Sequence, residues 1–226
     1  MRGLRALLVS LLVVVGVAGL LPVSVPASTD PEDLRTLAPA LELRLREWLV
    51  AWRVVQPRLR VEDFKRGGTG IIGAWRPLTI DLSQKNPRLP LYVFSPDGRW
   101  VVDPFGGLAM TKRDESVVVG FQPDSFVLLY DRRMPRMRQV LACGTTCGFQ
   151  EAAWLTNDRF VVAGYGEGQP KEGCRGGYTK TPILYLINLP QGSITTSVGP
   201  GSCEWVGIEY VIQKVKQKIP NVKFPY

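Results

Sequence analysis

A mainly β fold, made of four-stranded antiparallel meanders that follow an N-terminal helix, is what this 226-residue sequence predicts. From Gly67 onward, glycine and proline separate short runs rich in Val, Ile, Leu, Tyr and Phe, which is typical of many short strands. The hairpin sequence FSPDGRWVV at residues 94–102 returns as WLTNDRFVV at residues 154–162. Before Gly67, apolar residues recur at three- and four-residue steps, which indicates a helix.

The first 27 residues have the pattern of a secretory signal peptide. A start with two arginines precedes an uncharged run at residues 6–21, and VPA at residues 25–27 puts small residues where a signal peptidase reads. We therefore expect cleavage near Ala27 and a secreted or periplasmic chain. The alternative is an uncleaved membrane anchor at residues 6–25, for which the apolar run is short of the roughly 20 residues that a bilayer span needs.

The protein is basic, with a net charge of +8 that becomes +6 once the signal peptide and its two arginines are removed. In an exported protein, this charge favours another protein or an anionic envelope component as the partner. We expect no nucleic-acid partner, because the chain is expected outside the cytoplasm. We expect membrane contact only if the signal peptide is not cleaved. A basic surface that serves solubility alone is the alternative.

Residues 28–66 predict an N-terminal helical segment. Asp30-Pro31-Glu32-Asp33 is typical of a helix start. Pro39 predicts a break or kink, and so either two short helices or one helix that begins near it. We expect the apolar stripe to pack on the domain's own core, with docking on a partner or a membrane surface as the alternative. The stripe consists of Leu37, Leu41, Leu45, Trp48, Trp52 and Val55.

Residues 67–215 predict a β domain, and residues 216–226 predict a solvated basic tail. Strong turn sequences such as Pro96-Asp97-Gly98 and Pro190-Gln191-Gly192 separate the strands. The candidate strands are Ile71–Trp75, Leu78–Asp81, Leu91–Ser95, Trp100–Pro104, Ser116–Phe121, Phe126–Asp131, Gln139–Ala142, Ala152–Leu155, Arg159–Ala163, Ile183–Asn188 and Ser193–Ser197.

Each copy of the hairpin is followed by a longer loop, a third strand that ends in Asp131 or Asn188, a turn and a fourth strand. The result is two four-stranded meanders, at residues 91–143 and 152–199, in which the Asp or Asn side chain is expected to cap the next turn. The SPDG hairpin and the strand pair LYLINLPQGSI resemble the blades of β-propellers of the TolB and WD-repeat type. The resemblance covers about half of the mature chain and implies architecture only.

A closed propeller needs four to eight blades, and this sequence shows two. Residues 67–89 and 203–215 are candidates for a third, degenerate blade, which would still not close a ring. We therefore expect an incomplete propeller or a sandwich-like domain capped by the N-terminal helix. The alternatives are a homo-oligomer in which several chains complete one ring, and a hidden fourth blade.

The four cysteines predict disulfides, because their number is even and the chain is expected to be exported. In a meander, the loop after the second strand and the end of the fourth strand share one edge. This favours Cys143–Cys147 and Cys174–Cys203, although all four cysteines lie near one edge and crossed pairing stays open. The alternative is a four-thiolate zinc site, for which the second pair is too widely spaced to resemble a zinc ribbon.

The chain contains no histidine, which excludes catalytic sites and metal centres that depend on imidazole. Paired carboxylates remain, as in a small hydrolase acting on envelope polymers. Most of the acidic residues fall in predicted turns, where Asp is favoured for backbone reasons, so Asp103 and Glu115 are the two whose positions are least explained. The candidates for such a pair are Asp97, Asp103, Asp114, Glu115, Asp124, Asp131, Glu151 and Asp158.

The leading hypothesis is an exported, non-enzymatic binding or assembly module of the cell envelope that needs no cofactor and no metal. A hydrolase and a subunit that self-associates through its sheet edges are the alternatives. Two segments are candidate binding sites: an arginine-rich turn, because guanidinium groups suit carboxylate and phosphate, and the glycine-rich loop at residues 164–178. Their candidate residues are Arg132, Arg133, Arg136 and Arg138 in the turn, and Tyr165, Lys171 and Arg175 in the loop.

Overall fold

The computed structural model describes residues 34–225. The expected signal peptide and the helix-start sequence at residues 30–33 lie outside this range. The described residues belong to one compact unit, Glu32–Tyr226. Its helices are α1 (Leu34–Arg44), α2 (Arg46–Val55) and α3 (Ile208–Lys218), with short 3-10 turns at Val61–Asp63, Leu89–Leu91 and Arg175–Gly177.

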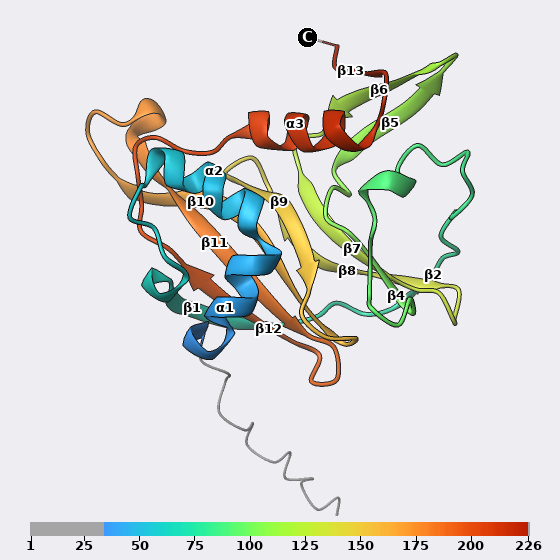
Figure 1. Ribbon diagram of the computed structural model, residues 1–226, viewed down its shortest axis with the longest axis horizontal. Helices are drawn as coiled ribbons and strands as arrows, with labels where there is room; N and C mark the ends of the chain where they lie inside the picture. The colour runs from blue at the N-terminus through green and yellow to red at the C-terminus, as the bar shows by residue number, and fades with distance from the viewer. Residues whose placement is uncertain (1–33, 226) are drawn as a thin grey trace, which may run out of the picture. The chain divides into compact units, whose positions relative to one another are not determined.

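The fold is mainly β, as predicted, and its strands form three sheets (Figure 1). Sheet 1 has the order β1-β12-β11-β10-β9, sheet 2 the order β2-β8-β7-β4-β3, and sheet 3 the order β13-β6-β5. The strands are β1 (Lys65–Ile71), β2 (Arg76–Pro77), β3 (Val93–Phe94), β4 (Trp100–Asp103), β5 (Leu108–Arg113), β6 (Ser116–Phe121), β7 (Ser125–Asp131), β8 (Arg136–Cys143), β9 (Cys147–Trp154), β10 (Arg159–Pro170), β11 (Tyr178–Asn188), β12 (Ser193–Val198) and β13 (Val222–Lys223).

Both predicted meanders are present. The strands β3, β4, β7 and β8 follow one another antiparallel in sheet 2, and β9 to β12 do so in sheet 1. The expected caps are also present, since the Asp131 carboxylate accepts the N–H of Arg133 at 3.0 Å and the Asn188 amide oxygen accepts that of Gln191 at 3.3 Å. Between β4 and β7 the first meander carries an extra hairpin, β5–β6, of which the sequence patterns indicated only β6.

The repeated hairpins bury both of their faces. Their first aromatic after the turn and their second valine enter one core shared by sheets 1 and 2; these residues are Trp100, Val102, Phe160 and Val162. The valine in between points the other way, because side chains alternate along a strand. Val161 therefore packs under the helices, and Val101 packs with Tyr92 and Tyr130 on the outer face of sheet 2. The two valines of each hairpin therefore belong to two different cores.

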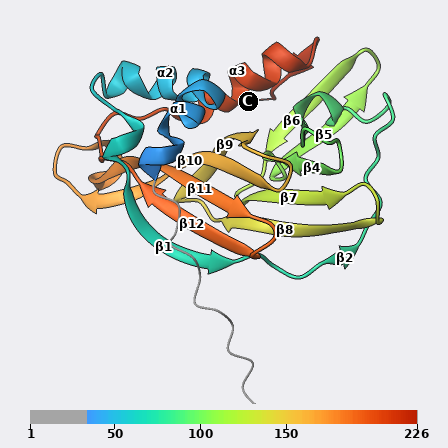
Figure 2. The ribbon, with the colours of Figure 1, turned by 60° about the horizontal axis from the view of Figure 1, so that its bottom comes forward.

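The helices α1 and α2 cover the face of sheet 1 that is turned away from sheet 2 (Figure 2). The predicted stripe packs on the domain's own core, with Leu41, Trp48 and Trp52 fully buried. Pro39 lies inside α1, and the break falls at the buried Leu45 instead. Hydrogen bonds continue across this break, from the Leu45 N–H to Leu41 and from the Leu49 N–H to Leu45, both at 2.9 Å.

The segment expected as a solvated tail is folded. Residues 208–218 form α3, whose Val211 and Val215 pack with the ensuing Ile219 against the β5–β6 hairpin. The chain then ends in β13, which pairs parallel with β6. The basic composition hid this helix, because Lys216 and Lys218 occupy the exposed side of an amphipathic pattern.

The expected third blade does not form. Residues 65–71 add β1 to the edge of sheet 1, and residues 76–77 add β2 to the edge of sheet 2, so each meander becomes a five-stranded sheet. The β1 strand is exposed along its whole length. Residues 203–215 supply a loop and most of α3 rather than strands.

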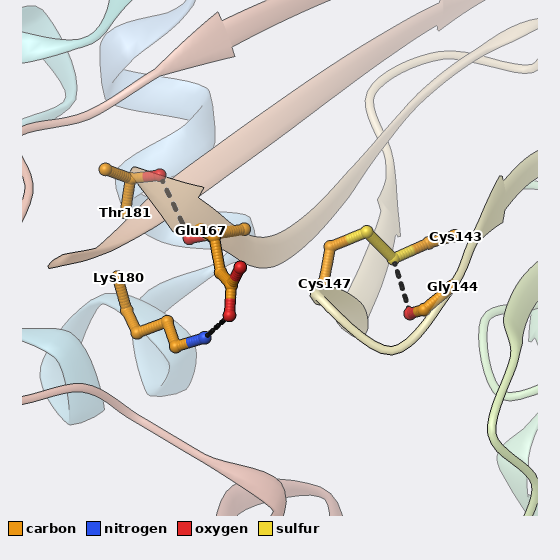
Figure 3. The surroundings of a disulfide bond; sticks show 7 residues. Cys143, Gly144, Cys147, Glu167, Lys180 and Thr181 are labelled. Atoms are coloured by element: carbon orange, nitrogen blue, oxygen red, sulfur yellow. Dashed lines mark hydrogen bonds and ion pairs between the residues drawn. A yellow bond between two sulfur atoms is a disulfide. The ribbon is translucent and has the colours of Figure 1, made fainter. Parts of the chain in front are cut away.

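The cysteines pair as predicted, Cys143 with Cys147 and Cys174 with Cys203, so none is a free thiolate for zinc. The first disulfide closes the connection from β8 to β9 (Figure 3). The second ties the tip of the β10–β11 hairpin to the segment between β12 and α3. Two disulfides fit a protein that folds in an oxidising compartment. None of the helices within residues 34–225 is long and apolar enough to cross a membrane.

Candidate functional site

A row of side chains across sheet 2 forms the most distinctive polar feature of the described chain. Trp100 on β4 lies opposite Asp131 on β7, and Asp131 lies opposite Arg136 at the start of β8. Arg138 follows two residues later on the same face of β8. We call this row, with Arg99 and Trp75, the arginine–tryptophan surface.

Trp75 reaches this surface from the connection between β1 and β2. The chain runs so close to β8 here that a Cβ at Gly73 would lie 2.9 Å from the Gln139 carbonyl oxygen. Only glycine leaves room for this approach. The Trp75 ring then stacks on Trp100 with 5.7 Å between ring centroids and 16° between planes.

Guanidinium groups lie over both indole rings. Arg136 and Arg138 each have their central carbon 4.3 Å from the centre of Trp75, and that of Arg99 is 4.2 Å from the centre of Trp100. At such distances the electron-rich ring face attracts a cation. The two rings and three arginines therefore form one stack at the rim of the core that sheets 1 and 2 share.

Asp131 holds the centre of this surface. Its side chain is fully buried, and one oxygen accepts two N–H groups of Arg136, at 3.0 and 3.3 Å, with an Arg99 nitrogen 3.5 Å away. Burial acts to raise the pKa of Asp131, but the N–H of Arg133 and the guanidinium groups of Arg136 and Arg99 outweigh it, so the pKa lies below its usual value. The carboxylate is therefore charged at neutral pH and offsets part of the positive charge.

Arg138 is the residue that makes this surface electrostatically incomplete. It is only 8% exposed, and among residues 34–225 it has no ion-pair partner. Its Nε is buried and has no hydrogen-bond partner there. Burial and the neighbouring charge of Arg136 lower the pKa of Arg138. An arginine nevertheless stays protonated in proteins, and within residues 34–225 this charge contacts the Trp75 ring but no carboxylate.

No family model, curated protein or solved structure matches this chain.

The function must therefore be inferred from the geometry of the chain itself, and the propeller-blade resemblance stays a prediction.

The exposed edge of the arginine–tryptophan surface is the predicted turn between β7 and β8. Arg132 and Arg133 are exposed there. Arg132 donates to the Gly98 carbonyl at 2.7 Å and lies 5.7 Å from the centre of the Phe94 ring, itself 40% exposed. The four predicted arginines thus divide into two at the surface, one that spans surface and interior, and one that is buried.

The glycine-rich segment does not join this site. Its first half, residues 164–170, belongs to β10 rather than to a loop, and residues 171–177 form the connection to β11, which begins at Tyr178. Tyr165 is half-buried against Trp205, at 4.5 Å between ring centroids, while Lys171 and Arg175 are exposed near the tip. The hairpin tip lies at the end of sheet 1 where Cys147 begins β9. The arginine turn lies at the opposite end of β8, whose eight residues span about 25 Å.

The two carboxylates that were candidates for hydrolysis, Asp103 and Glu115, lie in different environments. Asp103 is 1% exposed and accepts two bonds from Arg88, at 2.6 and 3.0 Å, and one from the Phe105 N–H at 3.0 Å. Burial raises its pKa against the opposing effect of Arg88. Glu115 is exposed at the turn between β5 and β6. Asp103 thus anchors the connection after β4. The buried Asp103 and the exposed Glu115 do not form an acid–base pair.

Sequence reasoning missed Trp75 and Arg99, which complete the surface. Arg99 could have been predicted from the repeated hairpin, in which it is the residue before Trp100. No sequence pattern indicated Trp75. It lies in a glycine-rich connection, and only the addition of β2 to sheet 2 brings it over β8.

Proposed function

We propose that the mature chain is an exported, non-enzymatic binding module of the cell envelope that holds an anionic group of its partner on the arginine–tryptophan surface. The observation that carries this proposal is the buried charge of Arg138, which has no carboxylate partner within residues 34–225. Buried charges in proteins are normally paired. A carboxylate or phosphate group of a partner, held by the exposed Arg132 and Arg133 and the half-buried Arg136, would supply the missing negative charge nearby.

The charge balance of the turn supports this assignment. The Asp131 carboxylate already contacts the side chains of Arg99 and Arg136, and within residues 34–225 the guanidinium groups of Arg132, Arg133 and Arg138 form no ion pair. Guanidinium groups bind carboxylate and phosphate through paired, parallel hydrogen bonds, which gives both attraction and orientation. The two disulfides and the basic charge of the chain agree with a place in an oxidising envelope compartment.

Trp75 and Trp100 provide a reporter for the test. We would titrate the chain from residue 28 onward with poly-L-glutamate and, separately, with polyphosphate, and follow tryptophan fluorescence. The variant replaces three arginines, Arg132→Gln, Arg133→Gln and Arg136→Gln, and retains Arg138 because its burial makes it part of the packing. We expect saturable binding of at least one polyanion by the natural chain and at least tenfold weaker binding by the variant.

The control loses the same charge elsewhere, through Arg58→Gln, Arg60→Gln and Arg66→Gln at exposed positions. A specific site predicts that this control keeps its affinity within about threefold, because exposed charges more than about 10 Å away are screened at 0.1 M salt. Equal losses in both variants would mean general attraction to a basic protein and would refute the site. The unfolding midpoint of each variant shows that it is folded.

A further inference from the structure

A cavity of about 120 Å³ lies at the end of the strands opposite the arginine turn. The connections β4–β5, β6–β7 and β8–β9 enclose it together with β10 and the first turn of α3. Its lining combines aromatic and aliphatic side chains with polar backbone and side-chain atoms. The apolar side chains include Phe105, Phe121, Phe126, Phe149, Tyr165 and Val211.

The walls are held apart by contacts that do not depend on the cavity being filled. The Gly106 N–H donates to the Phe126 carbonyl at 3.0 Å, which joins the β4–β5 connection to strand β7. Tyr165 lies over Gly148, where a Cβ would be 2.9 Å from its ring, and it also packs against the tilted ring of Trp205. The Cys143–Cys147 disulfide closes the third connection (Figure 3). The cavity is therefore preformed.

The mouth of the cavity differs from its interior. Gln122 and Thr145 are exposed and Ser125 is half-buried, and within residues 34–225 their side chains have no hydrogen-bond partner. Ile208, the first residue of α3, is 40% exposed beside them. Aromatic and aliphatic walls with a few polar groups that are free to bind are the usual composition of a small-molecule site.

The volume limits the ligand. Drug-sized ligands occupy pockets of about 300–1,000 Å³, whereas an apolar cavity of about 150 Å³ is enough to bind benzene. From this geometry we infer that the cavity binds a small amphipathic molecule, whose phenyl or short branched-alkyl group fills the interior and whose polar end meets Gln122, Ser125 and Thr145. This site is separate from the arginine–tryptophan surface and does not depend on it.

The first test uses the natural chain and a series of ligands of increasing size. Binding of 3-methylbutan-1-ol, benzyl alcohol and 2-naphthylmethanol is measured by amide chemical shifts in a titration. We expect saturable shifts at residues 105–108, 121–126 and 147–149 with the first two alcohols, and at least tenfold weaker binding of the naphthyl compound because it exceeds the cavity. Affinity that rises steadily with ligand size would indicate partition onto apolar surface and would overturn the inference.

The second test closes the mouth. Ile208→Trp is placed at a partly exposed position, and Ile71→Trp, at a site 87% exposed in β1, is the matched control. We expect Ile208→Trp to weaken benzyl alcohol binding at least tenfold and the control to leave it unchanged. If both variants bind alike, or if the natural chain shows no saturable shift up to the solubility of benzyl alcohol, the cavity is not a ligand site. Polyanion binding should be the same in all three proteins.

Discussion

Asp131 shows how one side chain carries both a local and a tertiary role. Its place at the end of a strand predicted a cap for the next turn, and the bond to the Arg133 N–H is that cap. The second oxygen has a tertiary role, since it binds Arg136 of β8 and faces Arg99, which lies in the turn before β4. The sequence showed the first role because it is local, and the second required the register of three strands.

We expect Asp131→Asn to lower the free energy of unfolding by about 1–2 kcal/mol at pH 7, since bonds to a charged group are worth more than neutral ones and the partly exposed arginines reduce that value. The pKa of Asp131 is lower in the folded chain. Its contribution is therefore present above the unfolded pKa of about 3.9 and is lost as the pH falls through the folded value. Urea unfolding at pH values from 7 to 2.5 measures the difference.

The difference between the natural chain and Asp131→Asn should shrink on acidification, while the exposed Asp124→Asn serves as a control with little effect at any pH. A difference that stays constant down to pH 2.5 would show that the carboxylate charge is not what stabilises the turn.

At the scale of elements, α3 is attached by a polar cluster as well as by its apolar face. Lys214 lies 2.6 Å from Glu47 of α2 and 2.9 Å from Glu151 of β9, and Tyr210 donates to Glu151. Burial acts to lower the pKa of Lys214, but the two carboxylates outweigh it and raise it. Burial and Glu151 raise the pKa of Tyr210. Lys214 and Tyr210 are therefore protonated at neutral pH, as these contacts require.

We expect Lys214→Met to destabilise the chain by about 1–3 kcal/mol, because it removes a charge-assisted bond to the mostly buried Glu151. The bond to Glu47, whose side chain is 66% exposed, contributes little of this. Hydrogen exchange of the α3 amides should accelerate more than that of β10. Lys216→Met, on the exposed side of the same helix, is the control, and equal acceleration in both variants would contradict the cluster's role.

At the scale of the whole molecule, the disulfides differ in how much chain they constrain. Cys174–Cys203 joins residues 29 apart, across the second half of sheet 1, whereas Cys143–Cys147 joins residues 4 apart. The entropy removed from the unfolded chain grows with the length of the closed loop. The longer disulfide therefore stabilises the whole fold, and the shorter one mainly shapes the connection beside the cavity.

Replacing Cys174 and Cys203 by serine should lower the free energy of unfolding by about 3.5 kcal/mol, and the same change at Cys143 and Cys147 by about 2 kcal/mol, for loops of these lengths. Urea unfolding of the two double variants, each with the other disulfide intact, measures both values. The reverse order of stability would show that native-state contacts at residues 143–147, and not chain entropy, dominate.

The sequence by itself determined the mainly β fold class, the two meanders and the turn caps, because each depends on residues close in the chain or on the fixed alternation of a meander. It favoured the observed disulfide pairing and left crossed pairing open. It also named the arginine turn. Only the tertiary structure decided that β1 and β2 extend the sheets, that the basic C-terminal segment folds as α3, and that the glycine-rich segment lies away from the arginines. Only the tertiary structure also showed that Trp75 packs against Arg136 and Arg138, and that the chain encloses a cavity. These features depend on the register and packing of segments far apart in the chain, where the contact partner and not the local pattern sets the conformation.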